Sequence, residues 1–179
     1  MKENVGPFNG VLDCLLRPGE YFAAMPLDGG YGPPLARVMV WAVFGSLTGL
    51  ALREGGIDFH SVLQNPSSLP VYVLMGTLYQ LAATFLSAGV FHVLCKLAGG
   101  KAGYQASFRV VAALAVLGPV MELAMLVPVY GLTAMCLLSI YYWLRAALEV
   151  HAAEPGRARL VFGLLGLGAL AISILYALI

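Results

Sequence analysis

The chain has 179 residues, of which 60% are hydrophobic and 11% are charged, with a formal net charge of +1 and a mean hydropathy of +0.86. A soluble globular domain carries about 25% charged residues, so this composition excludes a soluble fold. A nucleic-acid partner would require a clustered basic surface. Because the basic residues are spread over several short segments, we expect no nucleic-acid partner.

The first 34 residues form a polar, turn-rich segment. Apolar residues recur at helical spacing over 8–16, and Pro18 is placed to open a second short helix over 19–25. We expect the first helix to lie on the membrane surface, because nothing else of comparable size could cover its apolar face. Tyr21 and Phe22 of the second suit the headgroup level. No apolar stretch typical of a signal peptide follows Met1, so we expect the first span to direct insertion itself.

Five apolar stretches follow, at about 35–52, 71–97, 108–127, 130–148 and 160–178. Each is near the ~20 residues that a helix rising ~1.5 Å per residue needs to cross ~30 Å of hydrocarbon. The sequence therefore predicts an all-α polytopic membrane protein. An N-terminal segment, 1–34, carries short interfacial amphipathic helices, and residues 35–179 form a bundle of five transmembrane helices. The turn between Pro128 and Gly131 is short enough to make the third and fourth spans an antiparallel hairpin.

The distribution of basic residues predicts an orientation. With these spans, Arg53 is the sole basic residue on one side of the membrane. Nine lie on the other side: Lys2, Arg17, Arg37, Lys96, Lys101, Arg109, Arg145, Arg157 and Arg159. Because cytoplasmic loops carry the excess of Lys and Arg, we expect the N-terminus to be cytoplasmic and the C-terminus to be outside. The expected location is the inner (cytoplasmic) membrane of the cell.

Small residues mark the predicted helix-packing faces. Gly45 and Gly49 give the first span a G-x-x-x-G face, which is equally compatible with an internal helix contact and with a dimer face. Gly163 and Gly166 begin a similar ridge in the last span. In the second span, Gln80 belongs to a small and polar face that should point into the bundle.

Glu122 is the one acidic residue that falls within a predicted span, and Pro119 should bend the helix just before it. Gln80 reaches nearly the same depth, so Gln80 and Glu122 form a candidate intramembrane polar site for a proton or ion. The second interpretation places the carboxylate at the outer interface, near Arg53 or water. The closeness of Glu122 to the predicted end of its span favours this second interpretation.

No pattern points to catalysis, a metal or a cofactor. The cysteines lie in three separate segments without C-x-x-C spacing and are expected to be single buried or interfacial thiols: Cys14, Cys95 and Cys136. The histidines are expected to lie far apart on different membrane levels: His60, His92 and His151. His92 is interpreted as an interfacial side chain, and Arg109 as a snorkelling side chain at the end of its span. Because motifs of hydrolases, metalloproteases and P-loop enzymes are missing, we expect no enzymatic activity.

The assembled features resemble the Yip family of Ypt/Rab-interacting membrane proteins. The resemblance rests on five spans and on these residues: Pro18, Tyr21, Phe22, Tyr31-Gly32-Pro33, Pro119, Pro128, Gly131, Leu148 and His151. Among its members the chain looks like the compact, prokaryotic kind, for which Rab binding is not expected. The resemblance implies an interaction or membrane-organising scaffold of undefined biochemical activity, in contact with the lipid bilayer and with other membrane proteins or a second copy of itself. The alternative is a transporter of a small solute, proton or ion that uses Gln80 and Glu122.

Overall fold

The computed structural model describes residues 10–52 and 68–177, and within these ranges it contains helices and no strands. The elements in chain order are α1 (Val11–Leu16), α2 (Pro18–Ala23), α3 (Gly32–Ala51), α5 (Ser68–Leu97), α6 (Tyr104–Ala113), the 3₁₀ turn η1 (Leu114–Val116), α7 (Leu117–Ala124), α8 (Pro128–Glu149) and α9 (Pro155–Ala177). Arg53, Asp58 and His60, like Lys2 and Phe8, lie outside the described residues.

In the described part of the chain, five helical segments are long and apolar enough to cross a membrane. They are α3, α5, the continuous α6–η1–α7 segment, α8 and α9. The predicted all-α polytopic class, with short helices before the bundle, is confirmed. Each long helix begins a few residues before the apolar stretch that predicts it, because its first turn consists of interfacial residues such as Pro33 and Tyr104.

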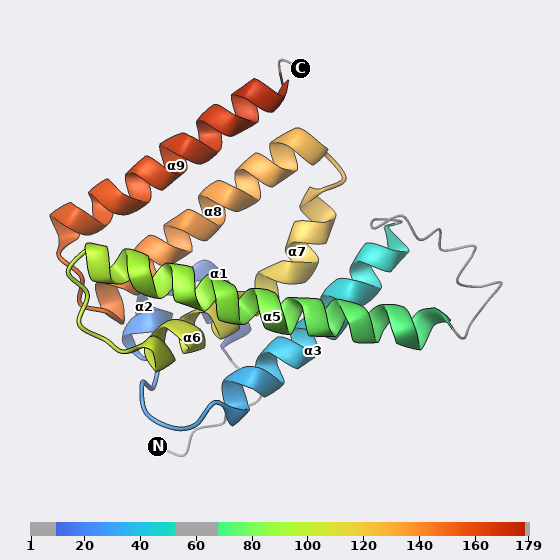
Figure 1. Cartoon of the computed structure of the whole chain (residues 1–179), viewed down its shortest axis with the longest axis horizontal. Helices are drawn as coiled ribbons and strands as arrows, with labels where there is room; N and C mark the ends of the chain where they lie inside the picture. The colour runs from blue at the N-terminus through green and yellow to red at the C-terminus, as the bar shows by residue number, and fades with distance from the viewer. Residues whose placement is uncertain (1–9, 53–67, 178–179) are drawn as a thin grey trace.

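The third span is the innermost helix of the bundle. Of its most apolar 18 residues, 56% are buried within the protein, against 11% for α9. Figure 1 shows α9 at one edge beside α8, while α3 and α5 cross on the other side of the molecule. The exposed side chains of α5 and α9 are largely Leu, Val and Ile, as expected for helices that face lipid.

The third span is interrupted near its middle. The turn η1 separates α6 from α7 and ends three residues before Pro119. Proline has no amide hydrogen, so Pro119 cannot donate to the carbonyl of Ala115. The freed carbonyl accounts for the tighter turn at this point, and the interruption lies where Pro119 predicts a bend.

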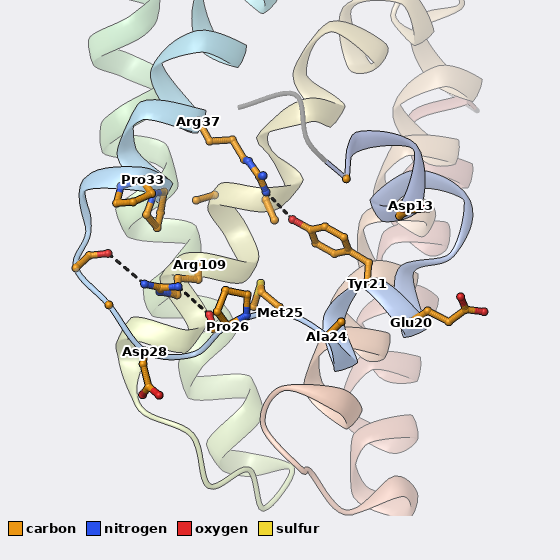
Figure 2. A pocket seen from close by; sticks show the side chains of 16 residues that line it. Asp13, Glu20, Tyr21, Ala24, Met25, Pro26, Asp28, Pro33, Arg37 and Arg109 are labelled. Carbon is orange, nitrogen blue, oxygen red and sulfur yellow. Dashed lines mark hydrogen bonds between the residues drawn. The ribbon is translucent and has the colours of Figure 1, made fainter. Parts of the chain in front are cut away.

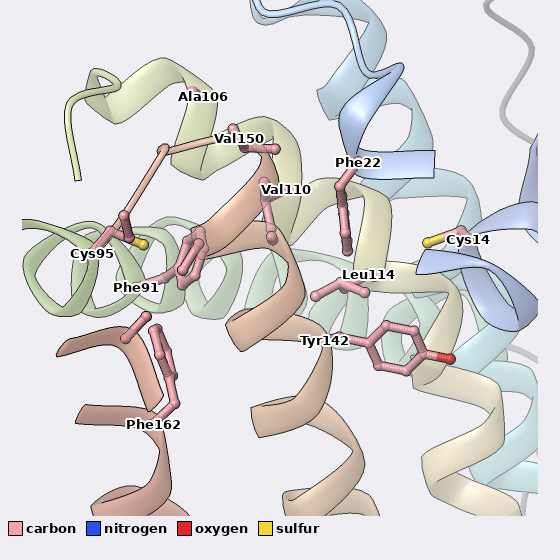
Figure 3. Close-up of a cluster of buried hydrophobic side chains, with 14 of the residues drawn as sticks. Cys14, Phe22, Phe91, Cys95, Ala106, Val110, Leu114, Tyr142, Val150 and Phe162 are labelled. Carbon is pink, nitrogen blue, oxygen red and sulfur yellow. The ribbon is translucent and has the colours of Figure 1, made fainter. Parts of the chain in front are cut away.

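The main core joins the N-terminal helices to the bundle. Cys14 of α1 and Phe22 of α2 are only 2% and 1% exposed. They belong to one cluster with residues of α5, α6, η1, α8 and α9, among them Phe91, Val110, Leu114, Tyr142 and Phe162 (Figure 3). The Tyr142 hydroxyl also donates a hydrogen bond of 2.7 Å to the backbone carbonyl of Leu15.

This packing corrects two expectations for the N-terminal segment. The expectation that only the membrane surface could cover α1 is wrong, because the bundle covers its Cys14 side and leaves Leu12 and Leu16 exposed. Phe22 is a core residue, so its ring contacts protein and not lipid headgroups. The physical reason is that α2 packs along α8, where Gly19 leaves room for the Arg145 side chain: a Cβ at Gly19 would collide with the guanidinium.

One end of the bundle brings together α1, α2, the 24–31 segment and the loops 98–103 and 150–154. We call this end the cap end. The two loops are joined by backbone hydrogen bonds from Lys101 to the His151 carbonyl (2.8 Å) and from Glu154 to the Ala98 carbonyl (3.0 Å). The described basic residues belong to these elements or to the adjoining helix ends. The predicted orientation requires the basic residues to gather at one end of the bundle in this way. The side of the membrane on which this end lies stays a prediction.

At the opposite end, α7 and α8 form a tight hairpin. The amide of Gly131 donates to the carbonyl of Val127, and a Cβ at Gly131 would overlap the carbonyl of Ala124. Glycine at this position therefore sets how closely the two helices approach.

Candidate functional site

A cavity of about 690 Å³ lies at the cap end between the N-terminal helices, α3 and α6 (Figure 2). Its lining contains two arginines, Arg37 and Arg109, and one tyrosine, Tyr21. The volume falls in the range of about 300–1,000 Å³ that is typical of small-molecule sites. This cavity is the most developed candidate site in the described part of the chain.

Arg109 of α6 ties the 24–31 segment to the bundle. Its guanidinium donates from Nη1 to the carbonyl of Pro26 (2.8 Å) and from Nη2 to the carbonyl of Gly30 (3.3 Å), as Figure 2 shows. Its Nε atom is buried and has no hydrogen-bond partner among the described residues. Arg109 is therefore not simply a snorkelling end, because it holds a distant segment and retains an unused donor.

Gly29 makes this arrangement possible. Its φ of +106° lies in the region that side-chain-bearing residues rarely adopt, and a Cβ there would lie 2.6 Å from Nη2 of Arg109. The carbonyl of Gly29 also accepts a hydrogen bond from Gln105 of α6. Gly29 thus permits both the turn and the close approach of the guanidinium.

Arg37 of α3 enters the cavity from the other side. It donates a hydrogen bond to the hydroxyl of Tyr21 on α2. Burial raises the pKa of Tyr21, and the positive charge of Arg37 opposes that shift, so the phenol is protonated at neutral pH. Arg37 and Arg109 each lie five residues after the first residue of their helix, and both line the cavity.

Carboxylates also line the cavity. Asp13, Glu20 and Asp28 are exposed, whereas Arg37 and Arg109 are half-buried. Glu20 also approaches Arg17 at 3.8 Å, an exposed pair of little energetic weight. The cavity therefore combines inner cations with acidic residues that reach solvent.

A second polar cluster lies close to the cap end and was not predicted. Ser107 Oγ lies 3.0 Å from Nδ1 of His92 and 3.0 Å from Nε2 of His151. The serine hydroxyl can donate to one ring and accept a hydrogen bond from the other. Ser107 and His151 are fully buried, and Nδ1 of His151 has no hydrogen-bond partner among the described residues.

The prediction that His92 and His151 lie far apart on different levels is wrong, since their ring centroids are 6.0 Å apart. The loop 98–103 folds α6 back beside α5, and the loop 150–154 lies over the end of α5. Burial lowers the pKa of His151 to about 4, and the nearby His92 and Lys96 act in the same direction. His151 is therefore neutral at pH 7.

The structure places Glu122 on α7 with its carboxylate against α3. A Cβ at Gly49 would lie 3.1 Å from Oε2 of Glu122, so the absence of a side chain there accommodates the carboxylate. Gln80 is half-buried on α5, and no hydrogen bond joins its side chain to Glu122 among those of the described residues. Neither residue lines the 690 Å³ cavity.

The four glycines proposed for helix packing lie in different surroundings. Gly45 and Gly49 are buried and face α7, near Gly118, Pro119 and Glu122. Gly166 faces α8, where an added Cβ would lie 3.9 Å from the Leu137 side chain. A Cβ added at Gly163 would meet no heavy atom of the described residues within 4 Å.

The thiols are isolated. Cys14, Cys95 and Cys136 are free, and the described residues contain no group of three His, Cys, Asp or Glu side chains able to hold a metal ion. Burial raises the pKa of Cys14 to about 12, with the charge of Arg37 opposing the shift, so this thiol is protonated and poorly nucleophilic at neutral pH.

Comparison with known families decides the identity of this architecture. The family described as the Yip1 domain matches residues 12–178. The chain belongs to the Yip1-domain family. No curated protein and no solved structure matches it.

The Yip1-domain match begins inside α1 and includes the 24–31 segment, so the cap end belongs to the domain as much as the five spans do. The predicted family and the multi-pass membrane character are confirmed. Sequence reasoning missed the cavity, because Arg37 and Arg109 were explained by topology alone. Their shared position at the beginning of a predicted apolar stretch was the available signal.

Proposed function

We propose that this Yip1-domain protein is a non-enzymatic scaffold of the inner membrane that binds other membrane proteins, or a second copy of itself, through its cap end. The single observation that carries the proposal is the incorporation of the N-terminal helices into the core at this end. Segments far apart in sequence thereby form one composite surface. A surface of fixed shape loses less conformational entropy on binding than a free tail would.

The exposed residues of the cap end suit such a surface. Leu12 and Leu16 of α1 are 70% and 76% exposed, and Lys101 of the loop 98–103 and Arg159 near the start of α9 are also exposed. Apolar anchors beside basic side chains are what a contact at the membrane surface requires. With the cap end cytoplasmic, as the basic residues predict, the partner would be reached from the cytoplasm.

The transporter alternative requires a water-accessible cavity lined by groups such as Gln80 and Glu122. The large cavity that the protein contains lies at the cap end and is lined by neither. Glu122 instead fills the space left by Gly49. These contacts favour the scaffold over the transporter.

Site-specific photo-crosslinking in intact cells tests the scaffold. A photoreactive residue at Leu12, Leu16 or Lys101 is expected to capture the same discrete protein, or the chain itself, at each position. Lipid-facing Leu164 and Leu167 on α9 serve as matched controls that should capture lipid. Capture of the same protein in equal yield at Leu164 and Leu167 would contradict a partner surface at the cap end.

A further inference from the structure

The 690 Å³ cavity at the cap end has a charge pattern that neither the scaffold function nor the family explains. Its half-buried members include two guanidinium groups, and its exposed members include three carboxylates, Asp13, Glu20 and Asp28. The formal charge of the lining is therefore close to zero, with the positive groups half-buried and the carboxylates exposed to solvent. A purely anionic ligand would meet the arginines favourably and the carboxylates unfavourably.

Arg109 supplies a donor that the fold leaves unused. Two of its nitrogens bind the carbonyls of Pro26 and Gly30, while the buried Nε has no partner among the described residues. A buried donor without a partner costs free energy that a bound acceptor would recover. Guanidinium groups bind phosphate oxygens through several N–H groups at once, so a phosphate is the acceptor that this geometry favours.

The position of the cavity indicates a ligand from the membrane. The predicted apolar stretches begin at about 35 and 108, so Arg37 and Arg109 lie within two residues, or roughly 3 Å at ~1.5 Å per residue, of the edge of the hydrocarbon. Long arginine side chains can reach the adjoining headgroup layer from this position.

We propose that this cavity binds the headgroup of a phosphoethanolamine-bearing lipid. The phosphodiester would lie against Arg109 on the side that faces Arg37, and the primary ammonium would meet Asp28, which lies on the 24–31 segment that Arg109 binds (Figure 2). A primary ammonium donates three hydrogen bonds to carboxylates, whereas the trimethylated ammonium of choline donates none. The site should therefore prefer ethanolamine over choline. The proposal goes beyond the scaffold function and does not require a protein partner.

Native mass spectrometry of the full chain, released from nanodiscs of equal parts dioleoyl phosphatidylethanolamine, phosphatidylcholine and phosphatidylglycerol, tests the proposal. We expect one retained phosphatidylethanolamine per chain. Arg109→Gln should reduce its retention about tenfold or more, given the weight of charge-assisted hydrogen bonds. Arg159→Gln, which removes an equivalent charge outside the cavity, should not change it. Equal retention of the three lipids, or retention that survives Arg109→Gln, would overturn the proposal.

A second variant guards against misfolding of Arg109→Gln. Asp28→Asn alters one exposed position and leaves the arginines in place, so the fold should be preserved. It is expected to lose the preference for ethanolamine and to retain phosphatidylglycerol instead. An unchanged preference in this variant would overturn the assignment of the ammonium to this carboxylate.

Soluble glycerophosphoethanolamine, added to the chain in detergent, distinguishes the two sources of the same headgroup. A stabilising shift in melting temperature that accompanies lipid retention supports the headgroup chemistry. Binding of the soluble compound without retention of the lipid would overturn the assignment to a lipid. Crosslinks at Leu12 and Lys101 test the scaffold independently of lipid retention. Failure of the headgroup proposal would therefore leave the scaffold proposal intact, and the reverse also holds.

Discussion

At the scale of single residues, Gly29 has a steric role that the adjacent Gly30 does not share. We expect Gly29→Ala to destabilise the chain by about 1–3 kcal/mol, because its φ is unfavourable for a side chain. The added methyl would also displace the Arg109 guanidinium, since it would lie 2.6 Å from Nη2. Melting temperature in detergent and phosphatidylethanolamine retention would both fall.

Gly30→Ala is the matched control for this prediction. A Cβ at Gly30 would approach no heavy atom closer than 4.0 Å among the described residues. We expect its melting temperature and lipid retention to stay near those of the parent. Equal effects of the two substitutions would mean that the backbone of the 24–31 segment does not constrain Arg109.

The buried His151 predicts a dependence of stability on pH. Its pKa is lowered to about 4 in the folded chain, so the unfolded chain binds a proton first as pH falls below the ordinary value of about 6.5. This contribution is complete above pH 6.5 and is lost as pH falls from 6.5 to 4. The loss is on the order of 3 kcal/mol, at about 1.4 kcal/mol per pKa unit.

His151→Asn keeps a neutral side chain able to hydrogen-bond, and we expect it to flatten the fall in melting temperature between pH 6.5 and 4. His92, the other ring on Ser107, is only partly buried and is left in place in the variant. An unaltered pH profile in His151→Asn would show that protonation of His151 does not limit stability in this interval.

At the scale of elements, a hydrogen bond from the Tyr142 hydroxyl to the Leu15 carbonyl links α8 to α1. A Tyr-to-Phe substitution removes this bond but keeps the packing of the ring, so the two contributions to stability can be measured separately. Tyr142→Phe removes the donor to the Leu15 carbonyl while keeping the buried ring. We expect a loss of about 1–2 kcal/mol and faster amide exchange in α1, because the Leu15 carbonyl loses this donor. Exchange in α9, at the far edge of the bundle in Figure 1, should stay unchanged.

Tyr141→Phe is the corresponding control on the same helix. Tyr141 is 49% exposed, whereas Tyr142 is 3% exposed, so removal of the Tyr141 hydroxyl should cost little stability. Amide exchange measured in nanodiscs compares the two variants. Exchange in α1 as fast in the parent as in a free peptide would refute docking altogether.

At the scale of the whole molecule, hydropathy was enough to predict the spans, because each apolar stretch is long and the membrane requires a helix. The cap end could not be predicted in the same way. Its contacts join residues far apart in sequence, such as Arg109 with Pro26 and Tyr142 with Leu15, and no local pattern encodes them. Arg109 has a sufficient local explanation as a topology determinant, which concealed its second role.

The same reasoning explains the outcome for the histidines and for Glu122. Ser107 is an unremarkable residue in the sequence, yet it joins His92 to His151 because two loops fold over the end of α5. Glu122 stands out in the sequence because charge is rare within spans. Its contact with Gly49 depends on how α7 packs against α3, which the composition of either helix does not reveal.

The orientation of the whole molecule follows from the gathering of basic residues at the cap end, and it can be measured directly. In a variant lacking Cys14, Cys95 and Cys136, single cysteines at Lys101 and Pro155 should resist an impermeant thiol reagent in intact cells. A cysteine at Asp58, which lies outside the described residues, should react.

Permeabilised cells provide the control for accessibility, and Lys101 and Pro155 are suited to it because both are exposed. There, all three cysteines should react, so protection in intact cells would reflect the membrane and not burial. Reaction at Lys101 with protection at Asp58 would invert the topology. The cap end, with its arginine-lined cavity, would then face the outside, and the proposed partner surface would have to be sought there.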